Sequence, residues 1–383
     1  MKKLILLLAA FAWCFSPVLA QSDSKESSQD FGANKLLITG HTTVTATIDS
    51  GTNNISDANF STIFLYQLSD KLFLESEIEI VTGGGSVEIG LEHANLVWMI
   101  GKNVAFHAGR FVPHFGLYRG RLGEGFINRF ATDPAGFGDG GIGTMEAVGF
   151  GLQGGFACGV SKMNYDLWVS DGPQLLTDPA NAGQFDYEAY LDNNKNKAIG
   201  GRIGFLPFSN SCLELGLSFE NATKTGAQYS DFEKVGVNMI AVDANFYHQV
   251  APLKSTIRLT GEYKMQKTDK FDYLALAATA EDSSAWLNHP NLNSNFDNSS
   301  NAFYVSGSIR PTGSESEILR NFELAYRYSQ FTPPKDAAWG GIQKIRTVAS
   351  LNYWLKWNCV LKVAYQQETN LTDAVFVQMY YGF

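Results

Sequence analysis

The sequence of 383 residues has few charged residues, few cysteines and no long apolar stretch after its first twenty residues. Charged side chains make up only 17% of the chain. No stretch after residue 20 reaches the roughly 18 uncharged apolar residues of a membrane-spanning helix. Apart from Cys14 there are three cysteines, Cys158, Cys212 and Cys359, and an odd number argues against a disulfide framework. These absences exclude a helical membrane protein and a small disulfide-stabilised secreted domain.

The motifs of common enzymes are also missing. Six histidines are scattered along the chain, without HExxH, without GxSxG and without the Lys-Ser/Thr ending of a phosphate-binding loop. We therefore predict no catalytic residue, no metal site and no cofactor. The formal charge of −9 becomes more negative once Lys2 and Lys3 are removed, which argues against a nucleic-acid partner.

The first twenty residues have the pattern of a secretory signal peptide. Lys2 and Lys3 precede an apolar run that ends in the small-residue site Val18-Leu19-Ala20. Residues 21–34 are polar and are expected to form a flexible periplasmic leader. The remaining residues, 35–383, are predicted to form one domain.

From residue 35 onward, apolar and polar residues alternate with the two-residue period of β-strands. The last segment, 374–383, places Val375, Val377, Met379, Tyr381 and Phe383 on one face, as in a strand that crosses a bilayer. It is expected to close a ring. Sixteen strands are predicted, at residues 35–48, 59–68, 71–81, 87–99, 104–110, 147–157, 162–170, 197–206, 212–221, 234–248, 254–267, 301–310, 320–330, 345–356, 358–367 and 374–383.

The polar faces of these strands carry many charges. In the third strand Leu72, Leu74, Ile78 and Ile80 oppose Glu75, Glu77 and Glu79. Charge at this density is too costly for a dry protein core but costs little against water. The fold class predicted is therefore all-β, a transmembrane antiparallel up-and-down β-barrel with an aqueous interior and its apolar face in outer-membrane lipid.

Connection lengths support this topology. Short turns alternate with long loops, so that all short turns fall on one side of an even-stranded barrel. The connection at Gly83-Gly84-Gly85 is the exception, because it is short although it falls on the side of the barrel that carries the long loops. Fourteen and eighteen strands are the alternatives that the pattern leaves open.

The third long loop, residues 111–146, contains too many aromatic and aliphatic residues for a solvated loop. Folding into the lumen would give Phe115, Tyr118 and Phe130 a wall to pack on. It would place Arg119, Arg121 and Arg129 in the channel, with Glu124 nearby. A loop on the barrel exterior or at a subunit boundary is the alternative.

The strand registers predict two rows of unlike charge facing the lumen. The acidic row comprises Glu75, Glu77, Glu79, Glu88 and Glu92. The basic row comprises Arg258, Lys264, Arg310, Arg327 and Arg346, with Lys356 and Lys362. Opposed rows would set up a transverse field across the channel, and the loop arginines would add local positive charge. A weak anion preference is the resulting expectation.

Together the signal peptide, the strand pattern, the terminal Phe383 and the long third loop resemble the general and substrate-selective porins of Gram-negative outer membranes. The segment Gly109-Arg110-Phe111-Val112-Pro113-His114-Phe115-Gly116 is similar to a segment that follows a strand in phosphate-selective-type porins, although His114 alters its spacing. The resemblance implies a third loop that constricts the pore, and trimers. It implies no phosphate specificity, because the family's full ladder of basic residues is not evident here.

The predicted function is thus an outer-membrane porin for small hydrophilic solutes or ions, constricted by loop 111–146. Two alternatives stay open. One is a barrel that acts as an adhesin or receptor through loops 171–196 and 268–300. The other is an outer-membrane hydrolase, for which His93, on an otherwise outward-facing side of its strand, is a candidate surface residue; His93 could equally lie at a subunit contact.

Overall fold

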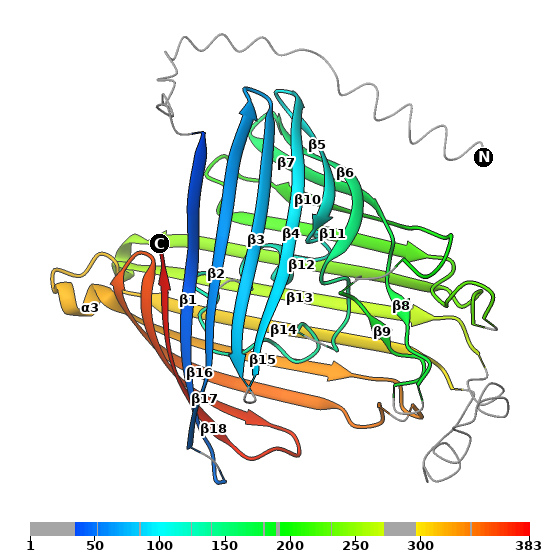
Figure 1. The fold of residues 1–383 in the computed structure, drawn as a ribbon. Coiled ribbons are helices and arrows are strands. Elements are labelled where there is room, and N and C mark those ends of the chain that lie inside the picture. Colours follow the sequence, from blue (N-terminus) through cyan, green and yellow to red (C-terminus); the bar gives the residue numbers. More distant parts are fainter. Residues whose placement is uncertain are drawn as a thin grey trace. The chain divides into compact units, whose positions relative to one another are not determined.

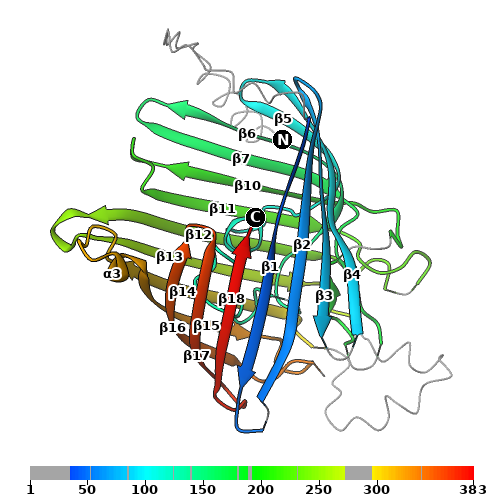
Figure 2. The same ribbon diagram turned by 60° about the vertical axis from the view of Figure 1, so that its left-hand side comes forward.

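Sixteen antiparallel strands close into a barrel (Figures 1 and 2). The computed structural model describes residues 35–383 except 52, 84–85, 124, 139, 179–180, 189–191, 231, 272–295 and 338. The predicted signal peptide and leader, residues 1–34, lie outside the described residues, as does Glu124. The sixteen-strand prediction is confirmed, and fourteen and eighteen strands are excluded.

Each barrel strand pairs with the next barrel strand along the chain. β7 therefore pairs with β10, because β8 and β9 are not part of the barrel. Their bounds are β1 (Leu36–Ile48), β2 (Asn53–Ser69), β3 (Leu72–Gly83), β4 (Ser86–Gly101), β5 (Val104–Phe111), β6 (Ala147–Cys158), β7 (Ser161–Ser170), β10 (Ala198–Leu206), β11 (Leu213–Ala222), β12 (Val237–Val250), β13 (Ser255–Thr268), β14 (Ser299–Arg310), β15 (Phe322–Thr332), β16 (Lys344–Lys356), β17 (Cys359–Glu368) and β18 (Ala374–Gly382). A separate two-stranded sheet, β8 (Gln174–Leu175) with β9 (Phe185–Asp186), lies in the loop between β7 and β10.

Helical segments are few and short: η1 (Tyr118–Leu122), η2 (Ala251–Leu253) and α3 (Glu317–Asn321). In the part of the chain that the structure describes, no helix has the length and apolar character needed to cross a membrane.

The ring closes between β1 and β18, which lie side by side in Figure 2. Phe383 continues this pairing beyond the last strand, because its N–H donates to the Gly40 carbonyl at 2.9 Å and its carbonyl accepts from the Gly40 N–H at 3.2 Å. The segment predicted to close the ring therefore does so.

The alternation of the strands separates an apolar outer face from a polar inner one. On β11 the outward side chains Leu215, Leu217 and Phe219 are 44–56% exposed, while the inward Ser218 and Glu220 are 0% and 1% exposed. An apolar outer band with a polar interior is the pattern of a barrel in lipid.

Most predicted strand bounds agree with the structure within two residues, and β2 is the clearest exception. It was predicted to begin at residue 59 but begins at Asn53, where it pairs with Ile48 of β1. A register shift between Thr45 and Ala46 interrupts the two-residue period there. Because a bulge of this kind adds a residue, the apolar and polar residues no longer alternate strictly, and the sequence pattern does not indicate a strand there.

A second bulge overturns the predicted orientation of His93. Glu77 of β3 pairs with His93, whereas the next residue, Ile78, pairs with Leu91, so Glu92 is an extra residue in β4. The bulge turns Glu92 and His93 to the same side, the lumen. The proposed roles of His93 at a subunit contact or as an outer-surface hydrolase residue are therefore wrong.

Candidate functional site

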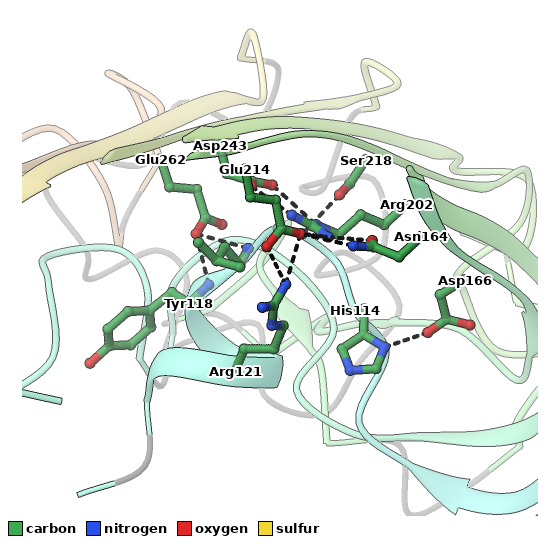
Figure 3. Close-up of polar contacts among 12 residues, drawn as sticks. His114, Tyr118, Arg121, Asn164, Asp166, Arg202, Glu214, Ser218, Asp243 and Glu262 are labelled. Carbon is green, nitrogen blue, oxygen red and sulfur yellow. Dashed lines mark hydrogen bonds and ion pairs between the residues drawn. The ribbon is translucent and has the colours of Figure 1, made fainter. Parts of the chain in front are cut away.

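The loop between β5 and β6, residues 112–146, runs inside the ring of strands (Figures 1 and 2). Its backbone is bound to inward-facing side chains of the far wall. Glu262 of β13 accepts hydrogen bonds from the Leu117 and Tyr118 N–H groups at 3.0 and 2.8 Å, and Ser218 of β11 accepts one from Gly116 at 3.0 Å (Figure 3). The inward path predicted for the loop is confirmed.

Gly116 makes the approach to β13 sterically feasible. Its φ is +76°, and a Cβ atom there would lie 1.8 Å from Glu262 Oε1. Only glycine tolerates both the left-handed backbone and the close carboxylate.

Aromatic side chains of the loop fill the space beside the wall. Phe115, Tyr118 and Phe130 are 2–5% exposed, and Phe137 packs edge-on against Tyr304 of β14 with ring centroids 4.9 Å apart. The Tyr118 hydroxyl donates to Asp133 at 2.7 Å, and burial raises the pKa of this hydroxyl well above its ordinary value. The loop thus has a dry, fixed side toward β11–β16.

The three loop arginines are held by carboxylates. Arg121 Nη1 lies 2.8 Å from both oxygens of Glu214 on β11 (Figure 3). Arg119 binds Glu146 at 2.8 Å and lies 3.6 Å from Glu92. Arg129 lies 3.3 Å from Glu323 on β15 and is only 14% exposed, whereas Arg119 and Arg121 are 32% and 42% exposed.

Most residues of the predicted basic row bind the loop to the barrel wall. They donate to its backbone carbonyls: Lys264 to Ile142 at 3.2 Å, Arg327 to Thr132 at 2.7 Å, Arg346 to Asp133 at 2.6 Å and Lys362 to Gly125 at 2.6 Å. Lys264, Arg327 and Lys362 are 1–2% exposed. The loop therefore covers these charges.

Three residues of that row lie elsewhere, and one of them, Lys356 at the end of β16, is exposed. Arg258 of β13 stacks over the Tyr247 ring, with its guanidinium carbon 4.3 Å from the ring centroid. Arg310, at the end of β14, donates to the Arg320 carbonyl in the turn that follows.

Residues of the predicted acidic row lie on the opposite wall, and three of them on β3 face the lumen. Glu77 and Glu79 accept hydrogen bonds from Ser61 and Asn59 of β2. His93 Nδ1 lies 3.3 Å from Glu77 Oε2, and its Nε2 lies 3.7 Å from Glu75. Glu88, near the long-loop end of β4, is exposed.

Between the loop and this acidic wall lie three adjoining cavities, which we call the β1–β5 path. Their volumes are about 350, 460 and 480 Å³. The first and second share His41, Glu77, His93 and Arg119 in their linings, and the second and third share His114, Gln153 and Asp166. The first reaches Thr45 and Val81 near the long loops, and the third reaches Lys102 and Asn103 in a short turn. The path thus leads from one side of the barrel toward the other.

Asp166 of β7 marks the junction of the second and third cavities, and sequence reasoning did not single it out. His114 of the loop lies 2.5 Å from one of its oxygens, and His107 of β5 lies 3.6 Å from the other (Figure 3 shows His114 and Asp166). The only signal in the sequence was its place next to Leu167: because side chains alternate along a strand, an outward Leu167 implies an inward Asp166. Among the described residues, no group of three or more His, Cys, Asp or Glu side chains is arranged so that it could hold a metal ion.

Known proteins resemble this chain in structure and not in sequence. No protein-family model and no curated protein matches the sequence. OmpF of Salmonella typhi superposes with a TM-score of 0.57 at 14% identity, covering 91% of this chain and 98% of its own. The fold is that of the outer-membrane porins. The channel DcaP of Acinetobacter baumannii (TM-score 0.55, 12% identity, 91% and 97% covered) and an anion-selective porin from Comamonas acidovorans (0.51, 13%, 91% and 99%) share this porin fold. At such identities the likeness establishes the porin fold alone.

Proposed function

We propose that the protein is a channel of the bacterial outer membrane for the passive diffusion of small hydrophilic solutes and ions. The observation that carries the proposal is the β1–β5 path, three cavities that adjoin one another through the barrel and whose linings include charged and other polar side chains. The apolar outer band and the porin fold support its location in the outer membrane.

Loop 112–146 is proposed as the constriction. It is bound along the β11–β16 side of the lumen, and the first and second cavities lie where it faces β1–β5. Arg119 and His114 reach from the loop into that space. The loop would set the size limit because its dry side is fixed by buried hydrogen bonds.

The charges along this space favour cations, whereas the sequence predicts a weak anion preference. The first and second cavities are lined by six carboxyl groups, those of Glu75, Glu77, Glu79, Glu92, Asp133 and Asp166, and by the one guanidinium of Arg119. The loop arginines that suggested an anion preference, Arg119, Arg121 and Arg129, are each paired with a carboxylate. The third cavity is lined by Lys102, Arg121, Arg202 and Asp166, and both of its arginines are paired with Glu214. We therefore propose a cation preference in its place.

Two neighbouring threonines of β1 provide the test of the channel. Thr43 lines the first cavity, while Thr42, which precedes it, alternates to the other face. Thr43→Trp should lower the single-channel conductance and slow the swelling of proteoliposomes in small sugars, because the indole would obstruct the cavity. Thr42→Trp should leave both unchanged. Equal behaviour of the two variants, or no conductance in the wild type, would refute the proposed channel.

Trimeric assembly is proposed from the same fold resemblance. The alternatives, a loop-based receptor and a hydrolase, gain no specific support from the described residues, and most of the loop that a receptor would use, residues 272–295, lies outside them. Phospholipase activity in the purified protein would favour the hydrolase.

A further inference from the structure

A small cavity of about 80 Å³ lies on the dry side of the loop, away from the β1–β5 path. Loop residues 127–130 form one side of it, and β12–β15 form the other. We call it the under-loop cavity. Its lining contains the guanidinium groups of Arg129, Arg258 and Arg327, and its described lining residues include no carboxylate.

The polar groups of the under-loop cavity are incompletely paired. Arg327 is 1% exposed, and only its Nη2 has a partner, the carbonyl and hydroxyl of Thr132. Its Nε and Nη1 have no hydrogen-bond partner among the described residues, and the same holds for the Tyr304 hydroxyl, which is 2% exposed. Buried donors without partners are rare in folded proteins and indicate a missing acceptor.

The charge in the cavity is also unbalanced. The one described contact of the Arg258 guanidinium is with the face of Tyr247. Glu323, the acid that pairs with Arg129, already accepts from Ser308 at 2.7 Å and from Trp354 at 2.8 Å. Glu323 and Asp133 act on Arg258 and Arg327 from beyond ion-pair distance. A water molecule would accept a hydrogen bond from Arg327 without adding the negative charge that an anion brings.

We propose that the under-loop cavity binds a small oxyanion of the size of inorganic phosphate or acetate. Guanidinium groups present forked donors that match carboxylate and phosphate oxygens, and such charge-assisted hydrogen bonds are stronger than those between neutral groups. Hydroxyl and amide groups of Asn245, Thr260 and Ser306 complete the lining. A volume of about 80 Å³ restricts the ligand to a small ion or a single acid group.

Such an anion would hold the loop in place. Arg129 belongs to the loop, while Arg258 and Arg327 belong to β13 and β15, so the ligand would bridge loop and wall. The site is separate from the path and does not depend on the protein being a channel.

The test uses the refolded full chain in detergent and titration calorimetry with inorganic phosphate, with acetate and chloride as further probes. The wild type should bind one phosphate saturably. Arg258→Gln should weaken binding at least tenfold, and it removes no described hydrogen bond, so the barrel should still fold. Tyr304→Phe, which keeps the charge, should weaken binding several-fold.

Arg310→Gln is the matched control, because it removes the same charge from β14 outside the cavity lining. It should leave the affinity within twofold of the wild type. Saturable binding of neither phosphate nor acetate, with or without binding of chloride, would overturn the proposal. An equal loss in Arg258→Gln and Arg310→Gln, or a loss in neither, would overturn it as well.

Discussion

Removing the carboxylates of β3 should reduce the cation preference of the channel. The perturbation is the triple variant Glu75→Gln, Glu77→Gln and Glu79→Gln. Each glutamine keeps the length of the side chain and an acceptor oxygen for Ser61 or Asn59, so the wall should keep its shape. Only the charge on this side of the β1–β5 path changes.

The size of the effect follows from electrostatics. A unit charge about 10 Å from an ion in water contributes about 0.4 kcal/mol, and screening in 0.1 M salt reduces this to about 0.15 kcal/mol. Each charge favours the cation and disfavours the anion, so it changes the permeability ratio by about 1.7-fold. Loss of three charges should therefore lower the cation-to-anion ratio about fivefold.

The assay is the zero-current potential of a planar bilayer under a gradient of KCl. Glu88→Gln is the control, since Glu88 is exposed near the end of β4 and lines none of the three cavities. Arg119→Gln should shift the potential in the opposite direction to the triple variant. A triple variant with the same potential as the wild type and as Glu88→Gln would refute the assignment of the path to this wall.

Three further predictions concern the loop and the assembly. Glu262→Gln should destabilise the barrel by about 3 kcal/mol in urea titrations, because it removes the carboxylate that lies 3.6 Å from the buried Lys264 ammonium. Ser218→Ala should cost about 1 kcal/mol for one lost hydrogen bond, and equal costs would contradict the anchoring role of Glu262. Gly116→Ala should release the loop from β13 and give larger or noisier single-channel currents, and wild-type currents would show that the tight approach is not required. Sedimentation of the native protein in detergent should give three times the monomer mass, and a monomer would contradict the proposed trimer.

Much of the barrel could be predicted from sequence because the two-residue period is a direct consequence of lipid on one face and polar groups on the other. The period failed where an extra residue enters a strand, as at Glu92, and there His93 was assigned to the wrong face. The inward course of the loop was predictable from its aromatic residues, since Phe115 and Phe130 need an apolar contact.

The contacts between loop and wall could not be predicted, because they join residues far apart in the sequence, such as Leu117 and Glu262, which are 145 positions apart. Lys264 and Arg327 face inward, but nothing in their own strands indicates that the loop covers them. The expected anion preference depended on the loop arginines acting as uncompensated positive charges, and their pairing with Glu146, Glu214 and Glu323 could not be predicted either. Likewise, the pairing of His114 with Asp166 depends on where the loop crosses β7.

Chemical modification of single cysteines tests most directly whether solutes pass between loop 112–146 and β1–β5. In a background with Cys158, Cys212 and Cys359 replaced by serine, Thr43→Cys places a thiol in the path, and Ser350→Cys places one on β16, where the serine is 1% exposed. A charged, membrane-impermeant thiol reagent should reduce the current through Thr43→Cys channels and leave Ser350→Cys channels unchanged. Block at Ser350→Cys without block at Thr43→Cys would place the path on the opposite side of the loop and contradict this account.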